Sequence, residues 1–183
     1  MDPEKEFHLI QKSLLGDTQA FRLLVETYQG LAYSIAFRFT REEQESEDIV
    51  QEAFAKVWKS LSRYDKKFPF KAWLARIVTN LSLDFLKSGR KKKETYTMLT
   101  REEGHRHEEL GSEADELRSI VYRLADQLTE KQKAVFVLRD LEMLKPDEVC
   151  EILQMSSGNM KSNLYYARIK IKEGLKKVYG TEK

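Results

Sequence analysis

Aromatic and basic side chains alternate between residues 64 and 76. The aromatic rings offer flat faces on which unpaired nucleobases can stack. The Lys and Arg side chains between them offer cations for phosphates, as single-stranded DNA binding requires. Phe70 and Trp73 also fit the apolar side of a helix, so each belongs either to the core or to a DNA contact. The aromatic residues are Tyr64, Phe68, Phe70 and Trp73, and the basic ones are Lys66, Lys67, Lys71 and Arg76.

A second candidate for nucleic-acid binding lies in residues 156–179. This segment has six Lys or Arg residues and one acid, Glu173, so it carries a local excess of positive charge. Such an excess suits phosphate contacts along a groove, and Asn159 and Lys161 near its start suit base edges. A solvated basic face on a small helical bundle would show the same pattern, so this segment alone leaves both interpretations open.

The third candidate surface is acidic. Asp48, Gln51 and Glu52 recur at the spacing of one helical face, away from the apolar residues of the same segment. Carboxylates repel DNA, so a partner of this face would be a protein. An ordinary solvated helix face is the alternative.

The sequence offers no pattern for catalysis. His8 falls in a start that we expect to be flexible, and His105 and His107 lack further ligands at metal spacing. Neither a glycine-rich phosphate loop nor a nucleophile motif is present. The lone Cys150 fits a small buried hydrophobe. We therefore expect a binding protein that is not an enzyme and has no cofactor or metal.

Helices must position these residues. Apolar residues recur at three- and four-residue spacing in segments 17–39, 46–61, 70–87 and from about 116 onward, without convincing strand alternation. Asp17 and Ser46 suit helix starts, Gly30 predicts a bend or break, and Gly89 predicts a helix end. The net charge of +2 means that DNA affinity must come from how the charges are distributed.

Residues 146–172 predict a helix-turn-helix. Pro146 suits the first position of a helix, and Ser156 can cap the next one after a turn over residues 154–158. The inward stripe that we expect on the second helix is Met160, Leu164, Ala167, Ile171, Leu175 and Val178.

Periodicity fades between residues 91 and 116, where a basic run gives way to an acidic one. We predict an all-α chain of two small helical domains, residues 1–90 and 117–183, joined by a flexible linker at 91–116. The second domain contains the helix-turn-helix. No apolar run approaches the roughly 20 residues that span a bilayer, and the start lacks a signal-peptide pattern. We expect a cytoplasmic protein with no membrane partner.

Three segments, in this order, resemble the extracytoplasmic-function group of the sigma-70 family. Residues 46–58, SEDIVQEAFAKVW, look like the helix that binds RNA polymerase. Residues 70–80, FKAWLARIVTN, are similar to the helix that recognises the −10 element, and residues 128–168 resemble the domain that recognises the −35 element. The resemblance implies a sigma factor, which binds core RNA polymerase and directs initiation at promoter DNA.

The resemblance also implies roles for single residues. Asp48, Gln51 and Glu52 match positions that bind the clamp helices of the polymerase largest subunit. The loop 62–69 corresponds to one that captures a base flipped from the melted strand, and Arg76 and Asn80 match DNA-facing positions. The residues that match the major-groove helix are Ser157, Asn159, Lys161, Ser162, Tyr165 and Arg168.

Further partners follow from the same resemblance. The polymerase flap would bind the carboxy-terminal domain, the acidic linker would pass along the RNA exit path, and an anti-sigma factor is the usual regulator in this group. The chain departs from the family pattern at Lys145-Pro146, at Val149-Cys150, and at Asn159-Met160, which replaces the common Thr-Val. The last change alters a DNA-facing residue and hence the expected −35 preference.

Two rival hypotheses remain at this point. A stand-alone helix-turn-helix regulator would bind duplex DNA by itself, but it would leave the acidic segment and the aromatic loop without a role. A helical adaptor would bind proteins alone, and its basic helix would be incidental. A polymerase pull-down with promoter-dependent transcription separates all three.

Overall fold

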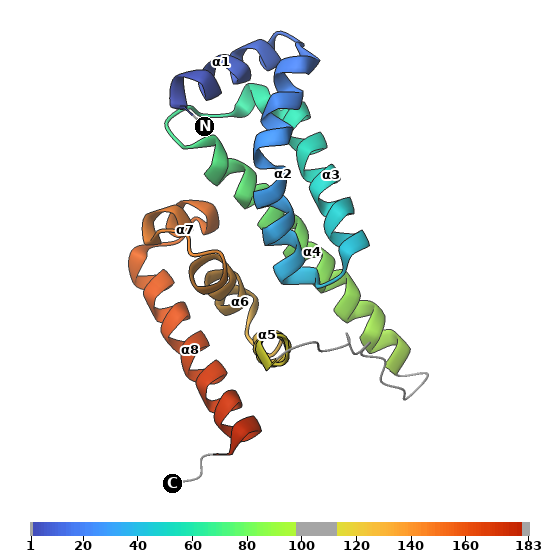
Figure 1. Cartoon of the computed structure of the whole chain (residues 1–183), viewed down its shortest axis with the longest axis vertical. Helices are drawn as coiled ribbons and strands as arrows, with labels where there is room; N and C mark the ends of the chain where they lie inside the picture. The colour runs from blue at the N-terminus through green and yellow to red at the C-terminus, as the bar shows by residue number, and fades with distance from the viewer. Residues whose placement is uncertain (1, 98–112, 181–183) are drawn as a thin grey trace. The chain divides into compact units, whose positions relative to one another are not determined.

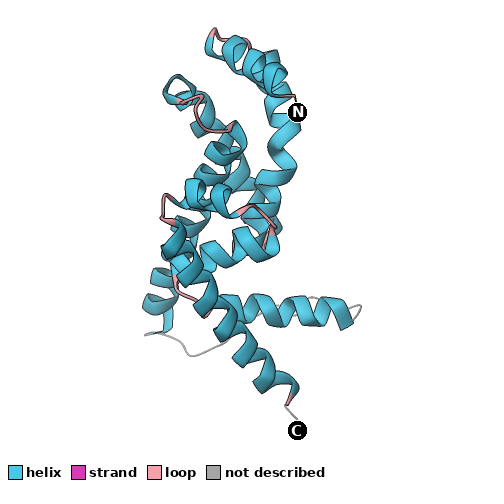
Figure 2. Cartoon of the chain, turned by 90° about the vertical axis from the view of Figure 1, so that its left-hand side faces the viewer, coloured by secondary structure: helices cyan, strands magenta, loops and turns pink. Residues whose placement is uncertain are grey.

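The computed structural model describes residues 2–97 and 113–180, and nearly all of them are helical (Figures 1 and 2). The predicted all-α class is confirmed. The chain divides into two compact units, residues 1–86 and 87–183. Within the described ranges, no helix combines the length and apolar character needed to cross a membrane.

The first unit is built from four helices and a 3₁₀ turn. Helix α2 packs against both α1 and α3. The core of this unit includes the fully buried rings of Phe39 and Phe70 together with Leu24, Ile35 and Leu74. The elements are α1 (Pro3–Leu14), α2 (Thr18–Thr40), α3 (Glu43–Ser60), the turn Leu61–Arg63, and α4 (Phe70–Thr97).

Helix α1 corrects the expectation of a flexible start that contains His8. The Asp2 carboxylate accepts the Glu4 N–H at 2.9 Å, and Pro3 occupies the first helical position, where its missing N–H costs nothing. Leu9 and Ile10 are buried and hold the helix on the unit. The capping signal Asp-Pro-Glu was present in the sequence, but only a few apolar residues follow it.

Helix α2 starts as predicted and does not break. The Asp17 carboxylate accepts the N–H groups of Gln19 and Ala20 at 2.9 and 3.0 Å, which confirms it as the N-cap. The expected break at Gly30 is wrong, because the helix continues through this position, and the alternative of a bend stays a prediction. One glycine costs a helix about 1 kcal/mol, and the packing of residues on both sides offsets that cost.

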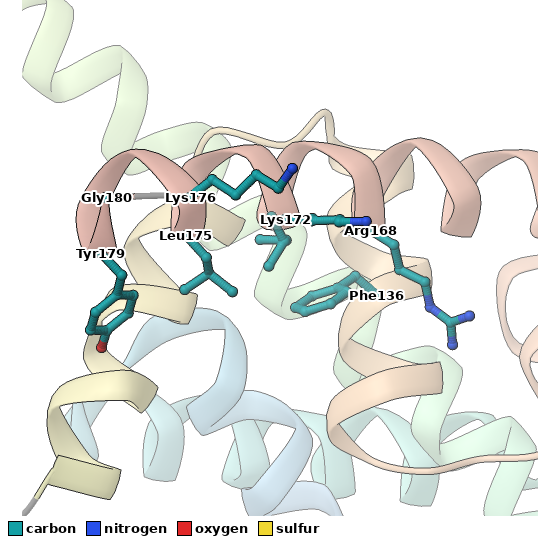
Figure 3. Close-up of a pocket in the computed structure, with 8 residues that line it drawn as sticks. Phe136, Arg168, Lys172, Leu175, Lys176, Tyr179 and Gly180 are labelled. Atoms are coloured by element: carbon teal, nitrogen blue, oxygen red, sulfur yellow. The ribbon is translucent and has the colours of Figure 1, made fainter. Parts of the chain in front are cut away.

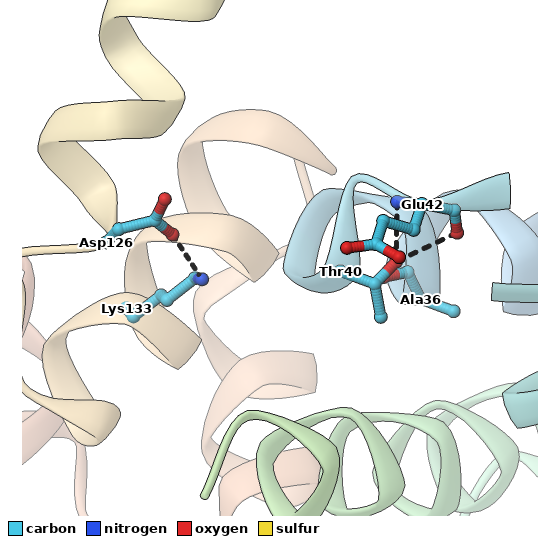
Figure 4. Close-up of polar contacts among 5 residues, drawn as sticks. All are labelled: Ala36, Thr40, Glu42, Asp126 and Lys133. Carbon is cyan, nitrogen blue, oxygen red and sulfur yellow. Dashed lines mark hydrogen bonds and ion pairs between the residues drawn. The ribbon is translucent and has the colours of Figure 1, made fainter. Parts of the chain in front are cut away.

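Helix α3 begins three residues earlier than the predicted start at Ser46. Ser46 is buried: its hydroxyl lies 2.7 Å from that of Thr40 and donates to the Glu42 carbonyl at 2.6 Å. Thr40 also bonds the Ala36 carbonyl at 3.2 Å (Figure 4). With Arg41 in the left-handed conformation (φ 58°), these bonds fix the α2–α3 turn.

Helix α4 runs to Thr97, so the expected helix end at Gly89 is wrong. Lys and Arg follow this glycine, and both favour helix, which is why the single glycine does not stop it. At the start of the helix Phe70 is fully buried and Trp73 is partly buried. Phe70 therefore belongs to the core.

The second unit contains the predicted helix-turn-helix. Pro146 is the first residue of α7, and the Ser156 hydroxyl caps α8 by accepting the Asn159 N–H at 3.2 Å. Residues 98–112, including His105, His107 and most of the predicted linker, lie outside the described part of the chain. The elements are α5 (Glu113–Ala125), α6 (Glu130–Phe136), the π-helical turn Val137–Leu141, α7 (Pro146–Leu153) and α8 (Ser157–Tyr179).

The inward stripe of α8 is shorter than predicted. Met160, Leu164, Ala167 and Ile171 are buried and Leu175, partly buried, packs against the same core, but Val178 is 50% exposed. The helix therefore continues past the core that it covers. Cys150, expected to be buried, is partly exposed.

A buried cation holds the start of α6 in the second unit. The Lys133 ammonium, 3% exposed, lies 2.8 Å from the Asp126 carboxylate at the end of α5 (Figure 4). The Lys133 side chain is buried, whereas that of Asp126 is 37% exposed, so the pair lies at the edge of the core.

Gly30→Ala is expected to stabilise the first unit. A Cβ at this position would meet nothing within 4 Å, so the gain in helix propensity, about 0.5–1 kcal/mol, has no steric cost to offset it. Chemical denaturation followed by tryptophan fluorescence isolates this unit, because both tryptophans, Trp58 and Trp73, lie in it. Destabilisation would mean that Gly30 provides a conformation the helix needs.

Candidate polymerase and nucleic-acid interfaces

The acidic face of α3, defined as Asp48, Gln51 and Glu52, is exposed to solvent. The opposite side of the same helix buries Ile49, Ala53, Phe54 and Val57 in the core. Packing therefore fixes the direction of the acidic face without using any of its polar groups.

The charge on this face is partly compensated. Glu52 lies 2.9 Å from the Lys56 ammonium one turn on, and both side chains are at least half exposed. Exposed pairs of this kind contribute about 0–1 kcal/mol, so a partner can replace Lys56 at little cost. The face can thus accept hydrogen bonds and cations from another protein.

The aromatic loop, residues 64–69, is closed by its own side chains. The Tyr64 hydroxyl donates to the Phe68 carbonyl at 2.6 Å, and the Asp65 carboxylate accepts the Lys67 N–H at 3.0 Å. The Phe68 side chain remains 49% exposed. Phe68 is therefore the loop ring that is open to a base, whereas Tyr64 shapes the loop.

Tyr64 belongs to an aromatic cluster with Phe70 and Trp73. Its ring lies 5.8 Å from Phe70 and 5.2 Å from Trp73, and Phe70 lies 5.4 Å from the ring of Tyr28. Burial, with the nearby carboxylates of Glu6 and Asp65, raises the pKa of Tyr64 to about 12. The hydroxyl therefore stays protonated at neutral pH and remains a donor.

The predicted DNA contacts on α4 do not share one face. Arg76 is partly buried and Asn80 is exposed, and their spacing of four residues places them on the same side as Trp73. Lys71 precedes Asn80 by nine residues, which is two and a half helical turns, so it points to the other side. The structure brings Arg76 and Asn80 together and separates Lys71 from them.

The first turn of α8 holds Asn159 by its backbone. Its N–H is bonded by the Ser156 hydroxyl, and its carbonyl accepts the side-chain amide of Asn163 at 2.8 Å. The Asn159 side chain is exposed. The other predicted contacts on α8 are also exposed: Ser157, Lys161, Ser162, Tyr165 and Arg168.

Arg168 has an intramolecular partner. Its guanidinium donates to both carboxylate oxygens of Asp140, at 2.8 and 2.6 Å, across 28 residues of sequence. This bidentate bond raises the pKa of Arg168. The pair joins α8 to the π-helical turn, so part of the positive charge that the sequence assigned to the DNA-facing side is neutralised within the protein.

Comparison with known proteins identifies both units. The family model for sigma-70 region 2 matches residues 24–92, and that for sigma-70 region 4 matches residues 118–171. The chain belongs to the sigma-70 family. It is an extracytoplasmic-function sigma factor, a non-enzymatic subunit that binds RNA polymerase and promoter DNA and directs promoter-specific initiation of transcription. Neither rival hypothesis accounts for the region 2 match.

Several sigma factors are similar to this chain over most of its length. The sigma factor is 28% identical over 183 residues to the RNA polymerase sigma-H factor of Pseudomonas aeruginosa, covering 94% of each chain. It is 29% identical to the sigma factor SigW of Bacillus subtilis, over 88% of this chain and 91% of the relative. Against the sigma-E factor of Escherichia coli, identity is 29%, with coverage of 87% and 88%.

Two solved structures share the fold. CnrH, solved with the cytosolic domain of CnrY, superposes with a TM-score of 0.70 at 23% identity, covering 93% of this chain and 97% of that one. RpoE of Bartonella quintana, solved with the anti-sigma factor NepR, gives a TM-score of 0.64 at 20% identity, with coverage of 85% and 96%.

A shallow apolar groove follows the second half of α8 in region 4 (Figure 3). Phe136 of α6 and Leu175 line its floor, and Lys172 and Lys176 stand at its edge. The groove lies along the part of α8 where the inward stripe leaves the core. It combines apolar area with positive charge, as a docking site for an acidic amphipathic segment would.

Several residues of these surfaces were not predicted from the sequence. Asp140 could not be found, because nothing local in the sequence links it to Arg168. Tyr166, 54% exposed, forms an edge-to-face pair with Tyr165 at 5.5 Å, and its exposure could have been inferred from helical spacing.

Among the described residues, no group of three or more His, Cys, Asp or Glu side chains lies close enough together to hold a metal ion.

Asp140→Asn is expected to increase the affinity of the holoenzyme for duplex DNA. The change frees the Arg168 guanidinium for a phosphate. The slope of log affinity against log salt concentration should therefore become steeper by about 0.9, the effect of one added phosphate contact. The measurement is a salt series on duplex DNA. The matched control is the double variant Asp140→Asn/Arg168→Ala, which should return the slope to the wild-type value.

The single variant Arg168→Ala tests whether the ion pair persists when DNA binds. If it persists, this variant leaves the slope of log affinity against log salt unchanged. A slope that becomes shallower by about 0.9, the effect of one lost phosphate contact, would show that Arg168 leaves Asp140 for a phosphate, as predicted from the sequence.

Proposed function

We propose that this sigma factor directs initiation through three surfaces: the acidic face of α3 for the polymerase, the aromatic loop with α4 for the −10 element, and α8 for the −35 element. One observation carries the proposal. The candidate residues for polymerase and for the −35 element are exposed, those for the −10 element are exposed or partly buried, and the three sets lie on separate elements whose opposite sides pack in the core.

The acidic face is proposed to bind the clamp helices of the largest subunit. Asp48 and Glu52 supply carboxylates and Gln51 an amide, one helical turn apart. Their partner would carry basic and amide groups at matching spacing. Charge complementarity of this kind speeds association and fixes the orientation of docking.

The aromatic loop is proposed to capture a base from the melted −10 strand. The exposed ring of Phe68 offers a stacking face, and Tyr64 supports the loop from the cluster side. Arg76 and Asn80 would contact the same strand from α4. Lys71, on the other side of the helix, would contribute through charge at longer range.

Helix α8 is proposed to enter the major groove of the −35 element. Asn159 and Ser162 lie near its start, where recognition helices place the side chains that contact base edges. Lys161, Tyr165 and Arg168 lie along one side of the helix. This side is proposed to contact the phosphate backbone.

Two further protein partners are also proposed. The apolar groove beside Lys172 and Lys176 suits the polymerase flap. An anti-sigma factor is proposed as the regulator, supported by the solved complex of RpoE with NepR.

The residues between the regions, 91–116, are proposed to act as a linker along the RNA exit path. The protein is proposed to work in the cytoplasm.

The double variant Asp48→Lys/Glu52→Lys is expected to weaken binding to core RNA polymerase by about tenfold or more, equivalent to about 1.4 kcal/mol. Both side chains are exposed, so helical content should not change. The matched control is Glu43→Lys/Glu47→Lys, which makes the same change in charge elsewhere on α3. Equal core affinity of the two double variants would reject the assignment of this face.

Asn159→Ala is expected to lower affinity by about 1–3 kcal/mol at one base pair of the −35 element and little elsewhere, since a side-chain amide can pair bidentately with adenine. Binding to a panel of single-base variants measures this. Asn163→Ala is the control, because its amide bonds the backbone of α8. A uniform loss across the panel would assign Asn159 to phosphate contact or to helix capping.

A further inference from the structure

Helix α1 lies outside the residues that either family model matches, so the comparisons give it no role. It is nevertheless a fixed part of the first unit. Leu9, Ile10 and Ser13 are buried, and Gly16, at φ 89°, permits the tight turn into α2. Because this side of α1 is buried, the fold also determines which way the other sides of the helix face.

One contact joins α1 directly to the aromatic loop, which passes beside it (Figure 1), and another joins α1 to the start of α4 through Tyr28 of α2. The Tyr28 hydroxyl donates a hydrogen bond to the Glu6 carboxylate, and the Tyr28 ring lies 5.4 Å from Phe70, where the loop ends. The Lys66 ammonium lies 5.7 Å from the centre of the Phe7 ring. The contacts through Tyr28 thus reach the buried residue that follows the loop, and the contact with Lys66 reaches the exposed part of the loop.

The contact with Phe7 restricts Lys66, an exposed side chain that would otherwise be ordered only when DNA binds. The contact with Glu6 adds a polar restraint to the packed ring of Tyr28. Ordering a loop or a long side chain during binding reduces affinity, and a group that is already in place avoids this cost. A cation within about 6 Å of an aromatic centre is attracted to the ring face. Phe7 therefore limits where Lys66 can go, and Glu6 limits Tyr28 and the ring it touches.

We propose that α1 holds the aromatic loop ready for base capture, with Glu6 and Phe7 as positioning residues. The inference rests on the proposed role of the loop. Glu6 keeps Tyr28 against Phe70, which fixes the base of the loop. Phe7 keeps Lys66 at the rim, where the phosphate of a captured nucleotide would need a cation. Neither positioning residue contacts DNA.

The test measures single-stranded DNA binding by holoenzyme assembled from core RNA polymerase and the full-length sigma factor. The probe is an oligonucleotide that the wild-type holoenzyme selects from a randomised pool. A series of derivatives replaces one base at a time with an abasic site. For the wild type, one abasic position should weaken binding about fivefold to a hundredfold, the contribution of one stacked base.

Phe7→Leu keeps apolar bulk but removes the ring face, so it should shrink that position-specific penalty by about two- to fivefold. Glu6→Ala should shrink it by a similar factor, because one hydrogen bond is lost. Phe7→Tyr and Glu6→Gln retain the ring and a carbonyl acceptor, and should behave as the wild type does. Glu4→Gln is the charge control on the same helix.

The outcomes separate the two ideas. A wild-type penalty that Phe7→Leu and Glu6→Ala both leave intact overturns the role of α1 and leaves base capture standing. A loss of binding that is equal at every position also overturns it, since that indicates general damage to the unit. If the wild-type holoenzyme shows no position-specific penalty, base capture by the loop fails, and the positioning role fails with it.

Discussion

The burial of Phe70 is the constraint on which the aromatic loop and the start of α4 depend. The ring is fully buried and contacts those of Tyr28, Tyr64 and Trp73. Because Phe70 is also the first residue of α4, this one side chain determines where the aromatic loop ends and where the helix begins. The exposure of Phe68, two residues earlier, follows from that placement.

Region 4 relies on directional polar contacts more than on rings. The ion pair of Lys133 and Asp126 joins the end of α5 to α6, the Ser156 cap starts α8, and Asp140 holds Arg168. Two of these contacts join neighbouring elements, and the cap determines where α8 begins. Helix α8 is thus held at its start by a cap and in its middle by an ion pair.

Local chemistry made much of the fold predictable. Asp17, Pro146 and Ser156 act where the sequence placed them, because capping depends on a few neighbouring residues. Gly30 and Gly89 misled, because tertiary packing and flanking residues outweigh one glycine. The exposure of the candidate contacts followed from helical spacing. The Arg168–Asp140 pair and the contacts of α1 with the loop did not, since they join residues far apart in sequence.

The Arg168–Asp140 pair also bears on how the free sigma factor is shared between polymerase and chromosome. A genome offers about 10⁶–10⁹ non-specific sites, and their hold on a protein depends on unneutralised cations. By engaging Arg168 internally, Asp140 removes one such cation from α8. In a chain whose net charge is only +2, this favours a pool of sigma factor that is not retained by bulk DNA and can therefore compete for core polymerase.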